Sequence, residues 1–386
     1  MYKPRWIYPT LAALALTSCE GGPTESQGAC AGITFAVAID PAGKALLYTP
    51  ELVHHHPDHA IRPMRRMPLP GTPLSVAVRT DGRFGVVPMG TAGAALVSFE
   101  TGTVVGELRV AGGSADAAAW NGDEVVFLAD RAAGVVTRFR VAPGAAPVQT
   151  GQVSVPAQPL QLLVYKEQVL VLSVASRTPG QGGRITSLDP QTLQTRWSTT
   201  TYGVDPVGMS VFGLDLSGTG EYKEHLSVLN ANNYALQPTG AQAQSRVAII
   251  NLATRALLRT FAVGEGATAY YARAEQAFVT TPTRGTTVLS LMQLNDYGPK
   301  QFFCARDASG ACRDVTSAWG TSWVEVFQTV ADRPWIYKFE VDYSRTDASV
   351  HVVTDSIALP AGSVGAAALE QPPVALPCND VIEYVG

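Results

Sequence analysis

Four of the six histidines in this 386-residue chain stand together in the segment His54-His55-His56-Pro57-Asp58-His59. In an extended segment alternate histidines point to opposite sides, and the proline can turn the chain so that later side chains rejoin the earlier ones. Imidazoles arranged in this way suit zinc, copper or nickel. The segment therefore predicts a zinc or copper site, and the alternative is a solvated histidine-rich loop between strands. The candidate ligands are His54, His56, Asp58 and His59.

A second segment carries oxygen atoms in the alternation used by calcium-binding loops. Its candidate ligands are Asp215, Ser217, Thr219 and Glu221. Position twelve of an EF-hand would be Leu226 instead of glutamate, so Glu221 or Glu224 would have to substitute. The alternative to a calcium site is a plain turn between two strands.

Linear signatures of the common enzymes are not found in the sequence. It contains no Gly-x-Ser-x-Gly elbow, no His-Glu-x-x-His, no phosphate-binding loop and no Gly-x-Gly-x-x-Gly fingerprint. Catalytic residues are therefore unknown at this level. The balance of 28 Lys+Arg against 32 Asp+Glu gives a net charge of −4, which lacks the basic excess of nucleic-acid-binding proteins. We expect no nucleic-acid partner.

The N-terminus has the pattern of an export signal. Lys3 and Arg5 precede an apolar run from Trp6 to Leu16, which is too short to cross a hydrocarbon core of about 30 Å as a helix. The run ends in Leu16-Thr17-Ser18-Cys19, which resembles a bacterial lipobox. This resemblance implies cleavage before Cys19 and attachment of lipid to it; the alternative is an ordinary signal peptide.

The resemblance divides the chain into three parts. Residues 1–18 are the expected signal peptide, residues 19–29 the lipidated cysteine with a polar, flexible tether, and residues 30–386 one folded domain. Glu20, where an Asp would imply retention in the inner membrane, implies the outer membrane. We therefore expect a protein of the cell envelope, anchored by lipid and facing either the periplasm or the exterior.

The remaining four cysteines fit an oxidising compartment, because they are even in number. They allow three pairings. We favour Cys304–Cys312, which closes a small loop, and Cys30–Cys378, which joins the two ends of the mature chain.

Internal repetition organises the mature region, where a turn followed by short apolar runs recurs at intervals of about 42 to about 61 residues. This interval suits a four-stranded blade. The first unit shows the pieces clearly, in the runs 74–79, 84–88, 94–99 and 104–110. The seven units begin at Pro73, Ala115, Pro159, Pro206, Ala267, Ser322 and Val364. We predict an all-β, seven-bladed β-propeller of antiparallel blades, with six or eight blades as alternatives.

Several units resemble known propeller repeats. Residues 275–291, and more weakly residues 123–139, are similar to the strand–loop–strand repeat of YVTN-type propellers. Residues 247–261 resemble the Val-Ile-Asp-x-x-Thr-Gly half of that repeat, with Arg255 where glycine is usual. Residues 184–197 are similar to the PQQ-type element that ends in Trp and occurs in the BamB family, an outer-membrane assembly lipoprotein.

The ends of the chain are expected to complete one blade together. Val364 leaves room for two C-terminal strands, one of them at Val381–Val385, and the runs 33–39 and 45–49 supply the other half. A Cys30–Cys378 bridge would lock this seam.

Three functions follow as hypotheses. The first is a lipid-anchored scaffold that binds a protein or ligand of the envelope, an envelope protein being the expected partner. The second is an enzyme of the lactonase or quinoprotein-dehydrogenase type, which similar repeats imply. The third is an assembly factor like BamB. Fold similarity alone does not choose among them.

Overall fold

The computed structural model describes residues 33–48, 52–53, 65–110, 113–142, 144–175, 182–214, 223–231, 244–273, 276–281, 285–290, 301–303, 309, 315–322, 325–330, 335–341 and 351–370. These residues fall within one compact unit, Gly32–Pro372. Among them no helix is long and apolar enough to cross a membrane.

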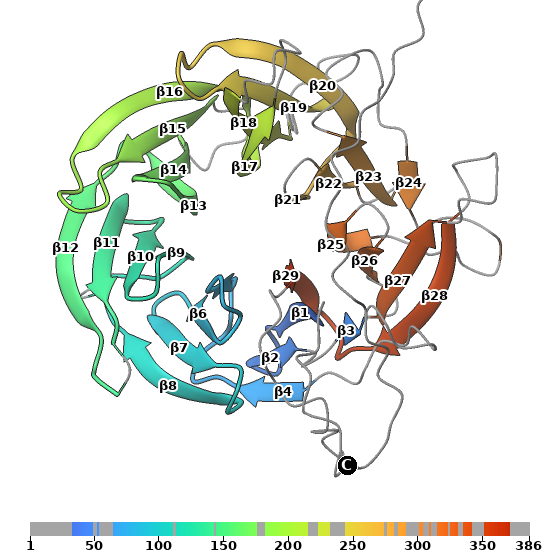
Figure 1. The fold of residues 1–386 in the computed structure, drawn as a ribbon, viewed down its shortest axis with the longest axis horizontal. Coiled ribbons are helices and arrows are strands. Elements are labelled where there is room, and N and C mark those ends of the chain that lie inside the picture. Colours follow the sequence, from blue (N-terminus) through green and yellow to red (C-terminus); the bar gives the residue numbers. More distant parts are fainter. Residues whose placement is uncertain are drawn as a thin grey trace, which may run out of the picture. The chain divides into compact units, whose positions relative to one another are not determined.

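Within the described residues, the strands of this unit form seven antiparallel sheets, so the prediction of a seven-bladed β-propeller is confirmed (Figure 1). Blade 1 contains β29 (Val364–Glu370), β1 (Ile33–Asp40), β2 (Ala45–Tyr48) and β4 (Arg65–Pro68), with β3 (Leu52–Val53) paired to β1. Blade 2 contains β5 (Ala77–Val78), β6 (Phe84–Pro88), β7 (Ala94–Ser98) and β8 (Thr103–Leu108). Blade 3 contains β9 (Ala117–Asn121), β10 (Val125–Asp130), β11 (Val135–Arg140) and β12 (Val148–Ser154).

The remaining blades follow in chain order. Blade 4 contains β13 (Gln158–Tyr165), β14 (Gln168–Val174), β15 (Gly182–Leu188) and β16 (Thr195–Val204). Blade 5 contains β17 (Pro206–Leu214), β18 (Lys223–Asn230), β19 (Gln244–Asn251) and β20 (Leu257–Glu265). Blade 6 contains β21 (Ala269–Arg273), β22 (Gln276–Thr281), β23 (Gly285–Ser290) and β24 (Gln301–Phe303). Blade 7 contains β25 (Val315–Ser322), β26 (Glu325–Val330), β27 (Trp335–Val341) and β28 (His351–Ala358).

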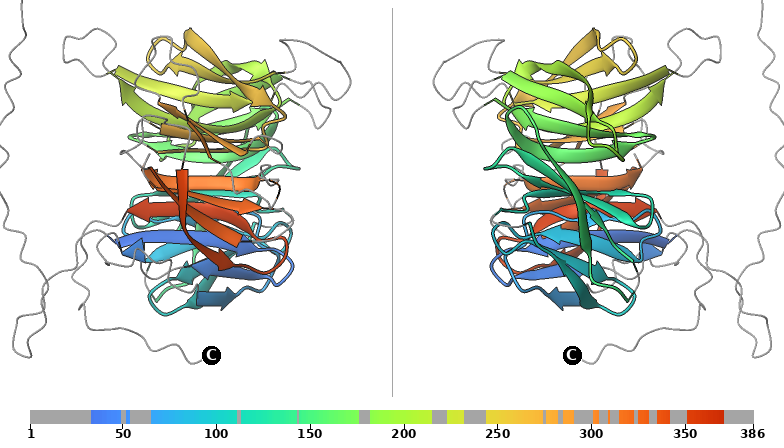
Figure 2. Two further views of the ribbon diagram at one scale, coloured as in Figure 1. Left: turned by 90° about the vertical axis from the view of Figure 1, so that its right-hand side faces the viewer. Right: turned by 90° about the vertical axis from the view of Figure 1, so that its left-hand side faces the viewer.

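Each sheet of blades 2 to 7 is a meander whose first strand lies nearest the middle of the ring and whose last strand lies on the outside (Figure 1). Side views show the strands of successive blades running across the thickness of this unit (Figure 2). The loops therefore gather at the two faces of the ring, where one blade's turns lie next to those of its neighbours.

Blade 1 is closed by the two ends of the chain, as predicted, because β29 pairs antiparallel with β1 along Thr34–Ile39. The predicted division into two strands from each end is wrong. The C-terminal side contributes the inner strand β29, and the N-terminal side contributes β1, β2 and β4. Arg65–Pro68 takes the outer position, and Val381–Val385 lies outside the described residues.

The predicted start of the sixth unit is also wrong by one strand. Ser322 ends β25 instead of beginning the inner strand of blade 7. Strand β25 has the sequence Val-Thr-Ser-Ala-Trp-Gly-Thr-Ser, in which small and polar residues outnumber apolar ones. An innermost strand faces the middle of the ring on one edge, so it does not need the continuous apolar run that marks a strand buried on both faces.

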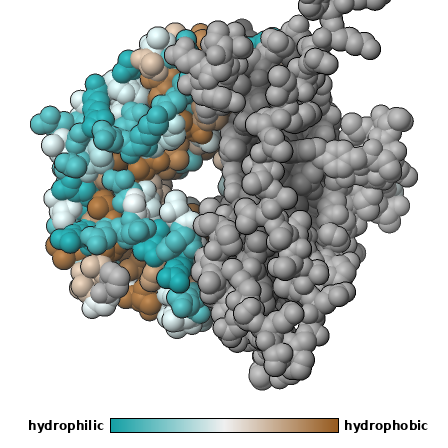
Figure 3. Space-filling view, viewed as in Figure 1, coloured by the Kyte–Doolittle hydropathy of each residue, from teal (hydrophilic) through white to brown (hydrophobic). Residues whose placement is uncertain are grey.

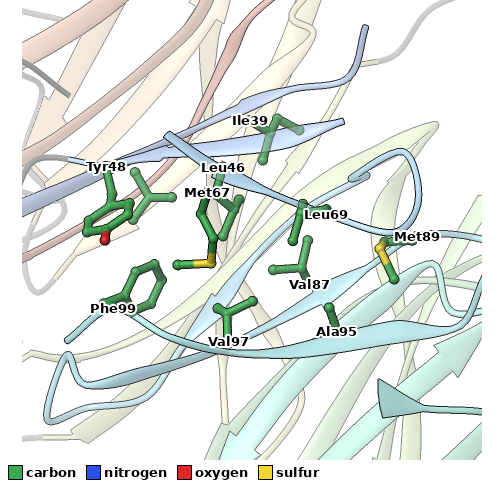
Figure 4. Packing of buried hydrophobic residues seen from close by; sticks show 11 residues of the cluster. Ile39, Leu46, Tyr48, Met67, Leu69, Val87, Met89, Ala95, Val97 and Phe99 are labelled. Atoms are coloured by element: carbon green, nitrogen blue, oxygen red, sulfur yellow. The ribbon is translucent and has the colours of Figure 1, made fainter. Parts of the chain in front are cut away.

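Buried apolar side chains pack between neighbouring blades. The middle strands are buried on both faces, as in β7, whereas the outer strands β8 and β12 alternate exposed with partly buried residues. Between blades 1 and 2, the rings of Tyr48 and Phe99 pack edge to face, with 5.3 Å between their centroids. Met67 packs beside them in the same buried cluster (Figure 4). Similar clusters join blades 2 to 3, 3 to 4, 4 to 5 and 5 to 6. Each of blades 1 to 6 thus depends on a neighbouring blade for burial of its apolar side chains.

Candidate binding site between blades 4 and 5

The candidate residues singled out in the sequence lie outside the described residues, so each remains a prediction. They are the lipidated Cys19, the disulfide cysteines Cys30, Cys304, Cys312 and Cys378, the metal ligands His54, His56, Asp58 and His59, and the calcium ligands Asp215, Ser217, Thr219 and Glu221. In the described part of the chain, no group of three or more His, Cys, Asp or Glu side chains is arranged to hold a metal ion.

The inner strands offer little charge to the middle of the ring. Across the seven of them the charged residues are Arg273 and Glu370, each the last residue of its strand. An opening remains at the middle of the ring beside the described blades (Figure 3). In sequence, the inner strands thus consist mainly of small, polar and apolar residues.

A shallow, open hollow of about 480 Å³ lies between blades 4 and 5 and adjoins a second hollow. The two share Gln168, Trp197 and Arg255. The hollows are formed by the β13–β14 turn, the start of β16, the start of β18 and the β19–β20 turn. Their other lining residues are Lys166, Glu167, Arg196, Lys223, Glu224, Asn251, Leu252 and Ala253.

Glu224 is held by two residues of the neighbouring blade. The Oη of Tyr165 donates to its Oε1 at 2.9 Å, and the Lys166 ammonium forms an ion pair with the same oxygen. Burial raises the pKa of Glu224, but the Lys166 and Tyr165 contacts outweigh that effect and hold the pKa below its usual value. Burial and the bond to Glu224 raise the pKa of Tyr165. The Glu224 carboxylate is thus favoured in its ionised form and is already paired with Lys166 and Tyr165.

Arg255 stacks on an indole of blade 4. Its guanidinium carbon lies 5.2 Å from the ring centroid of Trp197, within the range of a cation–π contact. Tyr202 of blade 4 donates from Oη to the Arg255 carbonyl at 2.8 Å. Nη1 of Arg255 donates to the Ala253 carbonyl, and its Nε is buried with no hydrogen-bond partner.

The turn before β20 sets the position of Arg255. Oδ1 of Asn251 accepts from the backbone N–H groups of Ala253 and Thr254 at 2.9 and 2.8 Å, and the Arg255 N–H donates to the Asn251 carbonyl at 2.8 Å. Side chains of Asn and Asp favour such turns because they bond the backbone two or three residues on. The turn brings Arg255 into the left-handed region, with φ of +62°.

Blade 4 uses the same turn between β15 and β16. Oδ1 of Asp189 accepts from Gln191 and Thr192 at 2.9 and 2.8 Å, and Leu193 has φ of +62°. The Thr192 backbone N–H, the Arg196 guanidinium and the Gln191 N–H hold the pKa of Asp189 well below its usual range. The turn fixes the start of β16, and Trp197 follows it.

Left-handed non-glycine residues gather around this site. Among the described residues they are Lys44, Ala157, Lys166, Leu193, Tyr202, Asp205 and Arg255. A bulky residue with positive φ is uncommon and costs conformational energy, and such residues cluster at functional sites. Lys166, Tyr202 and Arg255 all belong to the contacts described above. Three of these seven left-handed residues therefore lie at the site.

Exposed apolar side chains extend the site along the outer strands. Tyr202 is 39% exposed, and Leu257 and Leu258, directly after the Arg255 turn, are 39% and 42% exposed. Scattered exposed apolar side chains need no explanation, but Tyr202 bonds the Arg255 carbonyl and the two leucines stand two and three residues after Arg255.

Sequence patterns had marked parts of this site without joining them. Trp197 ended the PQQ-type element, and Arg255 was the departure from glycine in the YVTN-type element. Their pairing depends on the packing of blade 4 against blade 5, which no local pattern records. Glu224 had entered only as a substitute calcium ligand.

Comparison with known proteins shows the fold alone. No protein-family profile matches the chain, and no curated protein matches its sequence. The solved structure of the dihydro-heme d1 dehydrogenase NirN is similar at a TM-score of 0.55 and 12% identity, covering 85% of this chain and 67% of that one. The computationally designed protein Ika8 is similar at a TM-score of 0.52 and 11% identity, covering 84% of this chain and 91% of its own.

BamB from Moraxella catarrhalis is also similar, at a TM-score of 0.46 and 13% identity, covering 82% of each chain. A likeness at this level does not separate BamB from other propellers. The structures that resemble this chain thus include an enzyme and a designed protein, and fold does not choose the function.

Proposed function

We propose that this protein is a lipid-anchored β-propeller scaffold of the bacterial cell envelope, which binds a protein partner through the surface between blades 4 and 5. The observation that carries the proposal is the stacked pair Trp197–Arg255, next to the exposed side chains of Tyr202, Leu257 and Leu258. Trp, Tyr and Arg are the residue types that most often dominate the binding energy of protein interfaces.

The shape of the site favours a protein partner over a small molecule. Pockets for small molecules are usually concave enough to cover most of the ligand and are mostly apolar. The hollow between blades 4 and 5 is open and carries charged side chains from four elements. An exposed rim with a few well-held aromatic and arginine side chains is the arrangement found in protein interfaces.

The anchor is proposed on the sequence alone. Leu16-Thr17-Ser18-Cys19 would place lipid on Cys19, and residues 20–29 would tether the propeller to the membrane. Cys19→Ala should then release the protein from the membrane fraction or leave it as an uncleaved precursor. A Cys19→Ala variant that is still cleaved and still needs detergent for extraction would contradict the anchor without touching the binding site.

Site-specific photo-crosslinking in intact cells tests the partner. We would place p-benzoylphenylalanine at Leu258 on β20 and, as a matched control, at Val105 on β8, since both side chains are exposed and apolar on outer strands. We expect a discrete adduct from position 258 that is lost with Trp197→Ala, and none from position 105. Equal adduct patterns at both positions would overturn the proposal, and the mass of a discrete adduct would show whether the partner fits a BamB-like role.

A further inference from the structure

We infer that the hollow between blades 4 and 5 binds a carboxylate, supplied by an acidic segment of the partner protein and received by the guanidinium of Arg255 over Trp197. This inference rests on the proposed function and names the chemistry of the partner.

The side chains that line the hollow carry a net positive charge, whereas the whole chain is acidic. The residues that line it include four cations, Lys166, Arg196, Lys223 and Arg255, against two carboxylates, Glu167 and Glu224. The whole chain has a net charge of −4. Opposite charge on the partner would therefore be attracted to this region and repelled by much of the remaining surface.

Two carboxylates near the hollow, those of Glu224 and Asp189, are already engaged by other groups. Glu224 is engaged by Lys166 and Tyr165, and Asp189 accepts from Arg196 at 2.6 Å and from two backbone N–H groups. Among the described residues, the guanidinium of Arg255 makes one hydrogen bond, from Nη1 to the carbonyl of Ala253.

The remaining donors of Arg255 make it a receptor for an anion. Its Nε is buried and has no hydrogen-bond partner among the described residues, so a carboxylate would bind through the Nη groups. A guanidinium presents parallel N–H groups that match the two oxygens of a carboxylate, and stacking on an indole fixes the plane of the fork. An incoming carboxylate would thus find a cation whose orientation the Trp197 ring and the Ala253 carbonyl already set.

The left-handed position of Arg255 in its turn is taken by Leu193 in blade 4 and by glycine in blade 2. The related turn of blade 2 ends in Gly102, with φ of +68°, and Gly102 donates its N–H to the Ser98 carbonyl. Glycine adopts this conformation without strain, whereas an arginine there is strained. The Arg255 side chain, which stacks on Trp197 of blade 4, thus stands at a strained backbone position of blade 5.

The exposed side chains of Tyr202, Leu257 and Leu258, here called the apolar rim, indicate that the partner segment also carries apolar side chains. Leu257 and Leu258 stand two and three residues after Arg255, and Tyr202 donates a hydrogen bond to the Arg255 carbonyl. A segment that combines glutamate or aspartate with aliphatic side chains would place the carboxylate on Arg255 and the aliphatic groups on this rim. We therefore expect an acidic segment with interspersed leucines.

Fluorescence anisotropy with defined peptides tests the inference. The probe is a fluorescein-labelled amidated peptide, Glu-Glu-Leu-Glu-Glu-Leu, and its control has glutamine in place of each glutamate. Both are titrated with the purified full-length protein at low ionic strength. We expect the acidic peptide to bind on the order of tenfold more tightly than the glutamine peptide, and added salt to weaken its binding.

Variants locate the binding. Arg255→Gly suits the left-handed turn and so keeps the fold; we expect it to weaken binding of the acidic peptide on the order of tenfold. Arg109→Ala is the matched control, because Arg109 is exposed on blade 2 and pairs with Glu107 at 2.7 Å. Equal binding of the two peptides, or equal losses from Arg255→Gly and Arg109→Ala, would overturn the inference.

The two proposals fail separately. A discrete adduct at Leu258 without preference for the acidic peptide would keep the partner and reject the carboxylate site. Arg255-dependent binding of the acidic peptide without any adduct would support the carboxylate site and reject the partner surface in cells.

Discussion

Tyr165 at the end of β13 donates a hydrogen bond to Glu224 near the start of β18, with 2.9 Å between Oη and Oε1. This bond joins blade 4 to blade 5 at the edge of the hollow. Lys166, in the turn that follows β13, pairs with the same carboxylate. A comparable contact joins blades 2 and 3, where Nη1 of Arg79 donates to the Asp123 carbonyl at 3.2 Å. Polar contacts between neighbouring turns thus supplement the apolar packing between blades.

Replacing Glu224 with glutamine should reduce the acid sensitivity of the protein. The folded-state pKa of Glu224 is lowered, so its ionised form contributes stability that is present above its unfolded pKa of about 4.3 and is lost as the pH falls through the folded value. Chemical unfolding at pH 7 and pH 3.5 measures this. We expect a smaller difference between the two pH values for Glu224→Gln than for the wild type, and an unchanged difference would contradict the assigned contacts. Glu107→Gln, on blade 2, is the control for removing an exposed paired carboxylate.

Comparing Arg255→Gly with Arg255→Ala should separate the energetic cost of the left-handed backbone from the loss of the stacking contact with Trp197. Both variants lose the contact with Trp197, but only glycine relieves the left-handed backbone at φ of +62°. We expect the glycine variant to have the higher free energy of unfolding, by about 1 kcal/mol. Urea unfolding of the two proteins measures the difference. Equal stabilities would show that the turn relaxes away from the left-handed conformation.

The expected fold followed from patterns that are local in the sequence, whereas the candidate site did not. In blade 2, apolar runs bounded by turns placed three of the four strands closely, because the middle strands are buried on both faces and the turns are short. The inner strand β25 was missed because its polar sequence carries no such signal. Trp197 and Arg255 meet only because two blades pack together, and no spacing in the sequence specifies that contact.

His225 should make the protein less stable in mild acid. Its side chain is fully buried beside Phe212, with ring centroids 5.7 Å apart, and among the described residues neither ring nitrogen has a hydrogen bond of good geometry, the Lys223 backbone being the polar group that acts on the ring. Burial lowers the pKa of His225, and the backbone of Lys223 opposes part of that shift. The neutral form is therefore favoured in the folded state, so stability is complete above the unfolded pKa of about 6.5 and falls as the pH drops below it.

Replacing His225 with leucine, which has a similar volume, tests this reading. An apolar side chain leaves no unpaired polar atom, so we expect the free energy of unfolding at pH 7.5 to rise by roughly 1–3 kcal/mol. The decline of the melting temperature between pH 7.5 and pH 5.5 should also become smaller. A destabilised variant with an unchanged pH dependence would mean that the imidazole makes a bond that stabilises the blade.

Two glycines with positive φ should respond differently to alanine. Gly122 has φ of +62° and no atom within 4 Å of a built Cβ, so Gly122→Ala should cost about 1 kcal/mol for the backbone conformation alone. Gly93 has φ of +84°, and its Cβ would lie 2.6 Å from the Leu108 carbonyl oxygen. That oxygen belongs to the backbone of the outer strand, so Gly93→Ala should cost roughly 1–3 kcal/mol more. Urea unfolding measures both, and similar losses would contradict the close approach of β7 to β8.

Closure of the ring can be tested through the ladder between β29 and β1. Ala368 pairs with Ala36 and Ala367 with Val37, and neighbouring residues of a strand direct their N–H groups to opposite sides. One of these two N–H groups therefore points to β1 and the other away from it. Proline removes the donor, so we expect one of Ala367→Pro and Ala368→Pro to lower the free energy of unfolding by roughly 1–3 kcal/mol more than the other. The side chain removed is the same in both variants, which leaves the direction of the N–H group as their main difference. Equal, small losses in urea unfolding would mean that β29 does not hold the ring closed, and that blade 1 is stable on its N-terminal strands alone.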